Sequence, residues 1–171
     1  MNVNPRSIYN KKNEFHTFVE EEEIDCVFMS ESWERPDMPL DQIINLPNHV
    51  VISNPHQRKG VGGRPALIIN QSKYHVRNLT QSLIEIPWGV EATWAIISPK
   101  NVTSDSKIKK IALCSLYSKP SSRNKSLLLD HINQAFNVIS TKYGIGSTLS
   151  SQCNGCHAGE LGISIPNKQQ C

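Results

Sequence analysis

A series of short apolar segments, divided by turn-forming residues, constrains this chain more than any other feature of its sequence. Such segments cover residues 24–29, 49–53, 66–70, 74–79, 83–86, 90–98 and 110–117, and clusters of Pro, Gly and Asn separate most of them. Short runs bounded by turn residues are typical of β-strands. The run at 24–29 is apolar almost throughout, which favours a strand covered on both faces.

Two amphipathic segments complete the pattern. Residues 11–23 carry aromatic and Val side chains at helical spacing, so we expect a helix there, with the glutamates at 20–23 on its solvated end. Residues 125–143 repeat apolar side chains in the same way. Ser122 is a candidate amino-terminal cap, and Gly144 stands where a left-handed cap would end the helix. Helices combined with several strands predict an α/β protein with mixed sheets.

Length and charge leave several function classes open. A chain of 171 residues is long enough for one domain, which buries roughly 70% of its unfolded surface. The net charge of +3 permits contact with phosphates without requiring it. No apolar run approaches the ~20 residues of a membrane span, and the polar amino terminus lacks a signal peptide. Together with an odd number of cysteines, five, these features lead us to expect a reducing intracellular location, cytoplasmic or nuclear, and no membrane partner.

Three polar residues stand at or just beyond the ends of expected strands. Glu31 follows the run at 24–29, Asn4 follows a possible first strand, and Tyr117 ends the run at 110–117. Ligands of open α/β sheets bind beyond the carboxyl ends of strands, and a carboxylate there suits Mg²⁺ next to a phosphate. The alternatives are a solvated or capping Glu31, a turn Asn before Pro5, and a Tyr at a sheet edge.

The order of four motifs points to a known family. Residues 4–8 read Asn-Pro-Arg-Ser-Ile, a helical segment follows, and residues 25–33 read Asp-Cys-Val-Phe-Met-Ser-Glu-Ser-Trp. A Gly-rich turn at 60–63 precedes an apolar strand, and residues 116–120 read Leu-Tyr-Ser-Lys-Pro before the second helix. Over residues 2 to about 146 the chain resembles the apurinic/apyrimidinic-type endonuclease of non-LTR retrotransposons, within the endonuclease/exonuclease/phosphatase superfamily.

This resemblance implies a fold and a chemistry. It implies a partial four-layer α/β sandwich with mixed β-sheets over residues 1–146, with the carboxyl-terminal half missing. It makes Glu31 the ligand of a Mg²⁺ ion, Asn4 an orienting residue for the catalytic carboxylates, and Tyr117 a contact of the scissile phosphate. The implied reaction is hydrolysis of a DNA phosphodiester by an activated water, with Mg²⁺ stabilising charge on the phosphoryl oxygens.

Two motifs of that family do not occur in the sequence. The Gly-Asp-x-Asn segment that handles the water and phosphate is absent, and so is the Ser-Asp-His segment; the pair Asp130-His131 lies inside the expected second helix. We therefore expect this chain to be inactive, with exposed strand edges and marginal stability. Residues 147–171 are rich in Ser, Gly, Gln and Cys and predict an irregular tail, which we interpret as a frameshifted or mis-spliced continuation of a degraded mobile element.

Two clusters of basic residues suggest a contact with DNA. Arg58, Lys59 and Arg64 lie in one expected turn, and Lys119, Arg123 and Lys125 lie in another. If both turns face the site, they could hold the DNA backbone without reading its sequence. They could equally be solvated loops. A non-catalytic nucleic-acid-binding remnant is therefore the second hypothesis for this chain.

The cysteines of the tail raise a third hypothesis. Cys153, Cys156 and His157 match the attachment pattern of c-type haem, and Cys171 adds a fourth possible ligand for zinc. No Met follows the motif as a second axial ligand and no export signal precedes it, so we expect no haem. A small zinc-binding protein remains an alternative, beside coincidence in a low-complexity tail.

Overall fold

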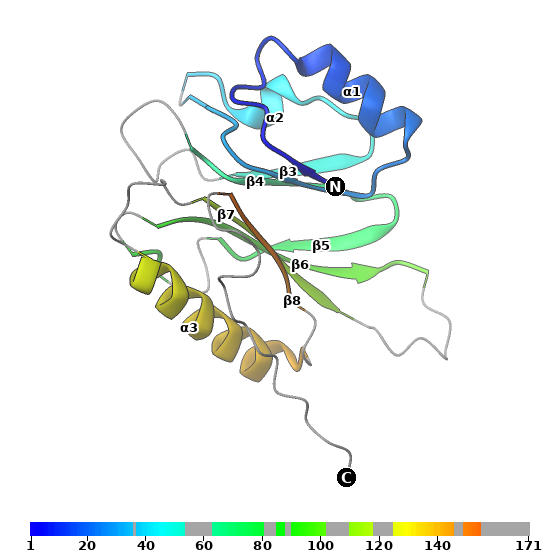
Figure 1. The fold of residues 1–171 in the computed structure, drawn as a ribbon. Helices are drawn as coiled ribbons and strands as arrows, with labels where there is room; N and C mark the ends of the chain where they lie inside the picture. The colour runs from blue at the N-terminus through cyan, green and yellow to red at the C-terminus, as the bar shows by residue number, and fades with distance from the viewer. Residues whose placement is uncertain are drawn as a thin grey trace.

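The computed structural model describes residues 1–35, 37–53, 63–80, 85–87, 90–101, 110–117, 125–145 and 149–154. These residues form four layers: two β-sheets face each other, and helices cover the outer face of each sheet (Figure 1). None of the helices in these ranges is long and apolar enough to cross a membrane.

The first sheet has the strand order β1-β2-β4-β3. Its strands are β1 (Asn2–Val3), β2 (Cys26–Met29), β4 (Ala66–Asn70) and β3 (His49–Ser53). β1 is parallel to β2, and the other pairs are antiparallel. Helices α1 (Lys12–Glu21) and α2 (Leu40–Ile43) lie on its outer face. The core between these layers contains Phe15, Val19, Val27, Met29, Leu40, Ile43 and Ile68.

The second sheet has the strand order β5-β6-β7-β8. Its strands are β5 (Tyr74–Asn78), β6 (Glu91–Pro99), β7 (Ile111–Tyr117) and β8 (Leu149–Asn154). β8 is parallel to β7, and the other pairs are antiparallel. Helix α3 (Lys125–Tyr143) covers the outer face. The core beneath it contains Trp94, Ile96, Ala112, Cys114, Leu128, Ile132, Ala135 and Ile139.

The two sheets bury their inner faces against each other. Side chains alternate along each strand, so Ile68 of β4 faces the helices while Leu67 and Ile69 face the other sheet. On the opposing sheet Ala95, Ile97 and Leu113 fill the same core. Burial on both faces explains why β4 is apolar over four successive residues.

The expected α/β class with mixed sheets is confirmed. β3, β4 and α3 have the bounds that the sequence predicts, and α1, β2, β5, β6 and β7 differ from the expected bounds by a few residues at most. Gly144 has the expected left-handed backbone, with φ of 61°. Ser122 and most of the strand expected at 83–86 lie outside the described residues.

Two elements were not predicted. Helix α2 has only four residues, too few for a helical repeat, and it begins where Glu34 Oε1 accepts a hydrogen bond from the Leu40 N–H at 2.7 Å. The expectation of an irregular tail over 147–171 is wrong for residues 149–154, which form β8. This polar segment is a strand because its backbone pairs with β7, from Ala112–Leu149 to Tyr117–Asn154. The boundary at residue 146 stays a prediction.

Candidate functional site

The strands that carry the predicted site residues end at one edge of the sandwich. β1 and β2 run parallel, with Val3 opposite Met29, so Asn4 and Glu31 follow neighbouring strand ends. The hydroxyl of Ser115 on β7 donates a hydrogen bond to the Met29 carbonyl across the two sheets at 3.1 Å. This bond brings the end of β7 against the end of β2. The carboxyl ends of strands from both sheets therefore meet at what we call the strand-end edge.

Glu31 lies in a turn whose backbone carbonyls are hydrogen-bonded to the segment after β1. Its carbonyl accepts a hydrogen bond from the Ser7 N–H at 3.0 Å, and the next carbonyl, of Ser32, accepts one from the Ile8 N–H at 3.4 Å. Glu31 has φ of 53°, a left-handed conformation that is uncommon for glutamate. Such conformations persist only where the surroundings impose them, and they cluster at functional sites. Glu31 is half-buried.

Asn4 and Tyr117 flank this turn in different ways. Asn4 is exposed and its Oδ1 accepts a hydrogen bond from the Arg6 N–H at 3.1 Å, which leaves its NH₂ group as the donor for another residue. Tyr117 is the last residue of β7 and is buried. In the strand register it stands opposite Glu91 on one side and Asn154 on the other.

Arg64 does not have the exposure expected of a phosphate contact. Its residue is only 5% exposed, and its Nη1 donates a hydrogen bond to the Glu34 carbonyl. A guanidinium held in the interior stabilises the turns around it, so its burial argues against a contact with DNA. Arg58, Lys59, Lys119 and Arg123 lie outside the described residues.

Two buried glutamates at this edge were missed by the sequence analysis. Glu34 is 1% exposed, and its Oε1 accepts hydrogen bonds from the Leu40 N–H and from the Ser53 hydroxyl at 2.9 Å. Glu91 is 3% exposed, and its Oε2 accepts a hydrogen bond from the Arg64 N–H at 2.6 Å. Neither position carries a motif. A glutamate at the start of an apolar strand was the only signal for Glu91.

Among the predicted site residues, Glu31 supplies the one carboxylate for a metal ion. No group of three or more His, Cys, Asp or Glu side chains comes together within them. Glu31 alone fits a Mg²⁺ ion, because Mg²⁺ keeps several waters and commonly takes one or two carboxylates beside a substrate phosphate. Among the tail residues considered for zinc or haem, Cys153 is part of strand β8. The others, Cys156, His157 and Cys171, lie outside the described residues.

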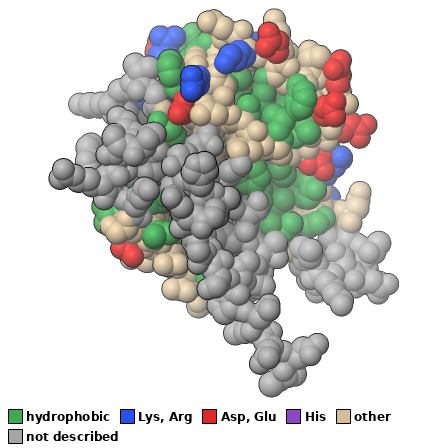
Figure 2. All heavy atoms as spheres, viewed as in Figure 1, with side chains coloured by type: hydrophobic (Ala, Val, Ile, Leu, Met, Phe, Trp, Pro, Cys, Tyr) green, Lys and Arg blue, Asp and Glu red, His purple; other side chains and the backbone are tan. Residues whose placement is uncertain are grey.

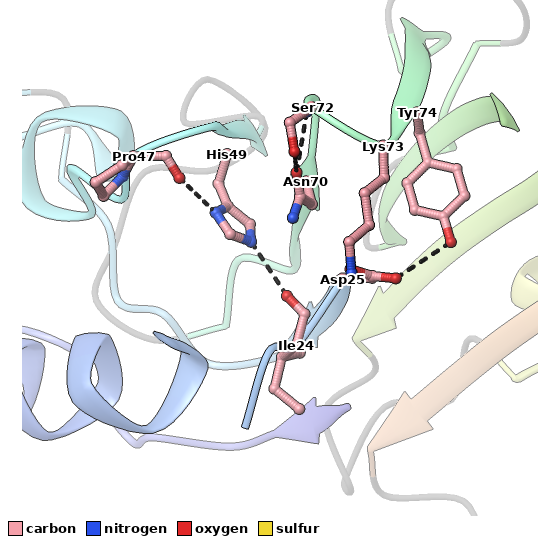
Figure 3. Close-up of polar contacts among 8 residues, drawn as sticks. All are labelled: Ile24, Asp25, Pro47, His49, Asn70, Ser72, Lys73 and Tyr74. Atoms are coloured by element: carbon pink, nitrogen blue, oxygen red, sulfur yellow. Dashed lines mark hydrogen bonds and ion pairs between the residues drawn. The ribbon is translucent and has the colours of Figure 1, made fainter. Parts of the chain in front are cut away.

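The opposite end of the sandwich has a different character. Lys73 Nζ forms an ion pair with Asp25 Oδ1 at 2.7 Å, and the Tyr74 hydroxyl donates to Asp25 Oδ2 at 3.3 Å (Figure 3). The ring of His49 bridges two backbone carbonyls, those of Pro47 and Ile24. An open groove of about 580 Å³ runs beside this cluster and is lined by Asn48, Val50, Val51, Ile52, Gln71, Ser72, Tyr74, His75, Val76, Asn78 and Lys100. It contains none of the predicted site residues.

Acidic side chains gather at the end of α1. The exposed glutamates at 20–23, at the end of α1 and just beyond it, contribute to the acidic side chains on that side of the molecule (Figure 2). An acidic surface repels the phosphate backbone of a nucleic acid. The glutamates at 20–23 therefore disfavour a polyanionic ligand at the end of α1.

Comparisons with known proteins bear on the fold. No protein-family model matches the sequence, and no curated protein matches it. Among solved structures, an endonuclease/exonuclease/phosphatase from Bacteroides vulgatus is 15% identical with a TM-score of 0.61, over 89% of this chain and 63% of that one. The endonuclease domain of TRAS1, a telomere-specific non-LTR retrotransposon, is 13% identical with a TM-score of 0.55, over 92% and 59%. The AP endonuclease LMAP from Leishmania major is 15% identical with a TM-score of 0.59, over 89% and 53%.

These similarities define the class. The chain has the fold of the endonuclease/exonuclease/phosphatase superfamily, as the motif order predicted. Solved structures that share this fold include the retrotransposon endonuclease domain and the apurinic/apyrimidinic endonuclease. It spans between about half and two thirds of the length of these solved chains.

Proposed function

We propose that this chain is part of a metal-dependent phosphodiesterase domain, the DNA endonuclease of a mobile element, and that the chain itself does not catalyse hydrolysis. The observation that carries the proposal is the meeting of strand ends, which brings the turn of Glu31 and the end of β7 at Tyr117 to one edge. Ligands of layered α/β proteins bind at such edges.

We assign each residue the role that the family resemblance implies. The carboxylate of the half-buried Glu31 would hold Mg²⁺, and the bound ion would stabilise charge on the phosphoryl oxygens. Tyr117, at the end of β7, contacts the phosphate or the leaving oxygen. Asn4 orients neighbouring carboxylates through its side-chain NH₂ group, because its Oδ1 is already bonded to Arg6.

The proposed inactivity follows from the strand after α3. The family resemblance requires Gly-Asp-x-Asn at the end of that strand. β8 reads Leu-Ser-Ser-Gln-Cys-Asn and carries no carboxylate, with Gln152 opposite Ser115 and Asn154 opposite Tyr117. Without a group to activate water, the rate falls by about 10²–10⁴ from this cause alone. We expect the chain to bind metal and phosphate without cleaving DNA.

A magnesium titration followed by amide chemical shifts tests the site. We expect shifts at residues 31–33, at Asn4 and at Tyr117 in the wild type, and none at these positions in Glu31→Gln. Glu22→Gln is the matched control, because Glu22 is an exposed glutamate just after α1. The proposal fails if Glu31→Gln binds Mg²⁺ as the wild type does, or if the shifts gather at residues 20–23.

The second candidate is a nucleic-acid-binding remnant without a metal site. The sequence positions of Arg58, Lys59, Lys119 and Arg123 favour it, and each phosphate contact lowers the logarithm of affinity by about 0.9 per decade of salt. Fluorescence anisotropy of a DNA duplex at 50 and 200 mM salt measures this slope. Binding that is salt-dependent, independent of Mg²⁺ and unchanged in Glu31→Gln favours the remnant. Stoichiometric zinc in the purified protein would favour a tail-centred function instead.

A further inference from the structure

Glu91 links the two sheets at the strand-end edge. It is the first residue of β6 in the second sheet, and its Oε2 accepts the Arg64 N–H just before β4 of the first sheet. Gly63, the residue before Arg64, has no room for a side chain. A Cβ at Gly63 would stand 2.3 Å from Oε2 of Glu91. Gly63 also has φ of 74°, which favours glycine. The carboxylate and the glycine turn are therefore fitted to each other.

The Gly63–Arg64 turn, which Glu91 holds, is hydrogen-bonded to the two residues that follow Glu31. The Arg64 carbonyl accepts a hydrogen bond from the Ser32 hydroxyl at 2.9 Å, and the Gly63 carbonyl accepts one from the Trp33 N–H at 3.4 Å. Ser32 and Trp33 come directly after Glu31 in the chain. A continuous set of hydrogen bonds thus leads from the carboxylate of Glu91 to the backbone beside the proposed metal ligand.

Glu91 is equally tied to the other half of the site. In the β6–β7 register it stands opposite Tyr117, the proposed phosphate contact. The side chain that fixes the Glu31 turn therefore comes from the strand position beside Tyr117. Displacement of this carboxylate would alter the relative placement of the two residues.

We propose that Glu91 is a positioning residue that sets the separation between Glu31 and Tyr117 by holding the Gly63–Arg64 turn. Its contribution to metal binding rests on the proposed function. Its contribution to the geometry of the edge does not. Glu91 is buried and is not itself a metal ligand in this proposal.

Amide hydrogen exchange tests the geometric part. In Glu91→Ala the Arg64 N–H loses its acceptor, and we expect exchange at Arg64, Ser32 and Trp33 to quicken about tenfold beyond any global change. Glu91→Gln should restore protection, because its side-chain oxygen can accept the same N–H. If Glu91→Ala does not fold, Glu91→Asp replaces it, since it keeps the charge but withdraws the carboxylate by one methylene.

Thr80→Val is the matched control for lost stability. The hydroxyl of Thr80 is buried and bonds both the N–H and the carbonyl of Trp94, so its bonds stay within the second sheet. This variant should lower global stability and leave exchange at Ser32 and Trp33 unchanged relative to the remaining amides. Equal effects of Glu91→Ala and Thr80→Val at Ser32 and Trp33 would overturn the proposal.

Magnesium binding tests the functional part separately. We expect Glu91→Ala to weaken Mg²⁺ binding at Glu31 about tenfold, Glu91→Gln to restore it, and Thr80→Val to leave it unchanged. If the wild type binds no Mg²⁺, the proposed function fails while the exchange experiment still decides the role of Glu91. If Mg²⁺ binds the wild type and Glu91→Ala with equal affinity, Glu91 does not position the site.

Discussion

Cys26 shows how a neighbourhood of a few residues sets chemical reactivity. It begins β2, is half-buried, and follows Asp25, whose carboxylate forms the ion pair with Lys73. Burial, and then the negative charge of Asp25, raise the pKa of the Cys26 thiol to about 11. Because the thiolate is the reactive form, a thiol with this pKa reacts slowly near neutral pH.

We predict that Cys26 resists alkylation. At pH 8 its thiolate fraction is about a hundredfold below that of an ordinary thiol, so iodoacetamide should label it at least that much more slowly in the folded chain than in urea. Mass spectrometry of the peptide that contains Cys26 measures the rate. Asp25→Asn should speed labelling only modestly, since burial is the larger cause. Equal rates in buffer and in urea would contradict the pKa shift.

A second prediction concerns Gly63. Made in the wild-type chain, Gly63→Ala places a methyl group against Glu91 and also forces alanine to a positive φ. Made in a chain that already carries Glu91→Ala, the same substitution costs only the backbone strain of the positive φ, about 1–2 kcal/mol. We expect the two substitutions to couple by at least about 1 kcal/mol in urea unfolding. Additive effects would show that the methyl group and the carboxylate do not meet.

Among the elements, α3 and β6 are joined by a buried polar contact. His131 of α3 is 1% exposed, and its Nε2 accepts the Trp94 indole N–H at 3.1 Å. Only a neutral ring with its proton on Nδ1 can accept this bond. Burial lowers the pKa of His131 below its ordinary value. The folded chain therefore binds a proton here less readily than the unfolded chain does.

The sign of the resulting pH dependence follows from linkage. Above about pH 6.5 both states hold a neutral His131, and no stability is lost. Below that pH the unfolded state gains a proton first, so the free energy of unfolding falls until the folded pKa is reached. We predict that His131→Gln, which keeps an acceptor for Trp94, flattens the stability curve between pH 6.5 and 5. Urea unfolding at several pH values measures it.

His16→Gln is the comparison for that experiment. His16 on α1 also has a lowered pKa, with burial the first cause and Lys12 the second, but it is only half-buried. Its substitution should flatten the curve less than His131→Gln does. The prediction is wrong if the wild type and His131→Gln lose stability equally on acidification.

The sequence predicted those elements that carry their own pattern. α3 and β4 have apolar spacing and turn residues at their borders, so local information suffices. β8 has no such pattern, and its structure depends on pairing with β7, more than thirty residues away in the chain. At the site, the turn of Glu31 could be located from a strand end. The burial of Arg64 and the role of Glu91 could not, because both depend on a turn of one sheet meeting a strand of the other.

On the scale of the whole molecule, the described residues form two sheets that bury each other's inner faces. Buried hydrogen bonds also join the two sheets. Thr93 of β6 donates to the Pro65 carbonyl at 2.8 Å, and Ser115 of β7 donates to the Met29 carbonyl, so two buried hydroxyls join the sheets near the strand-end edge. β8 lies at the outer edge of the second sheet, beside β7. β8 therefore covers an edge of β7, and the residues of β7 are nearly all buried.

We predict that β8 stabilises the domain and keeps β7 from associating with other chains. A chain ending at Ile145 should unfold at a lower urea concentration than a chain ending at Asn154. Its free energy of unfolding should be lower by about 2 kcal/mol or more, because the backbone hydrogen bonds between β8 and β7 are lost. It should also scatter light at protein concentrations where the longer chain does not, since an unpaired apolar strand is a template for further strands. Comparison of these two chains isolates the strand itself. Equal urea midpoints and equal scattering would mean that the second sheet is complete without β8.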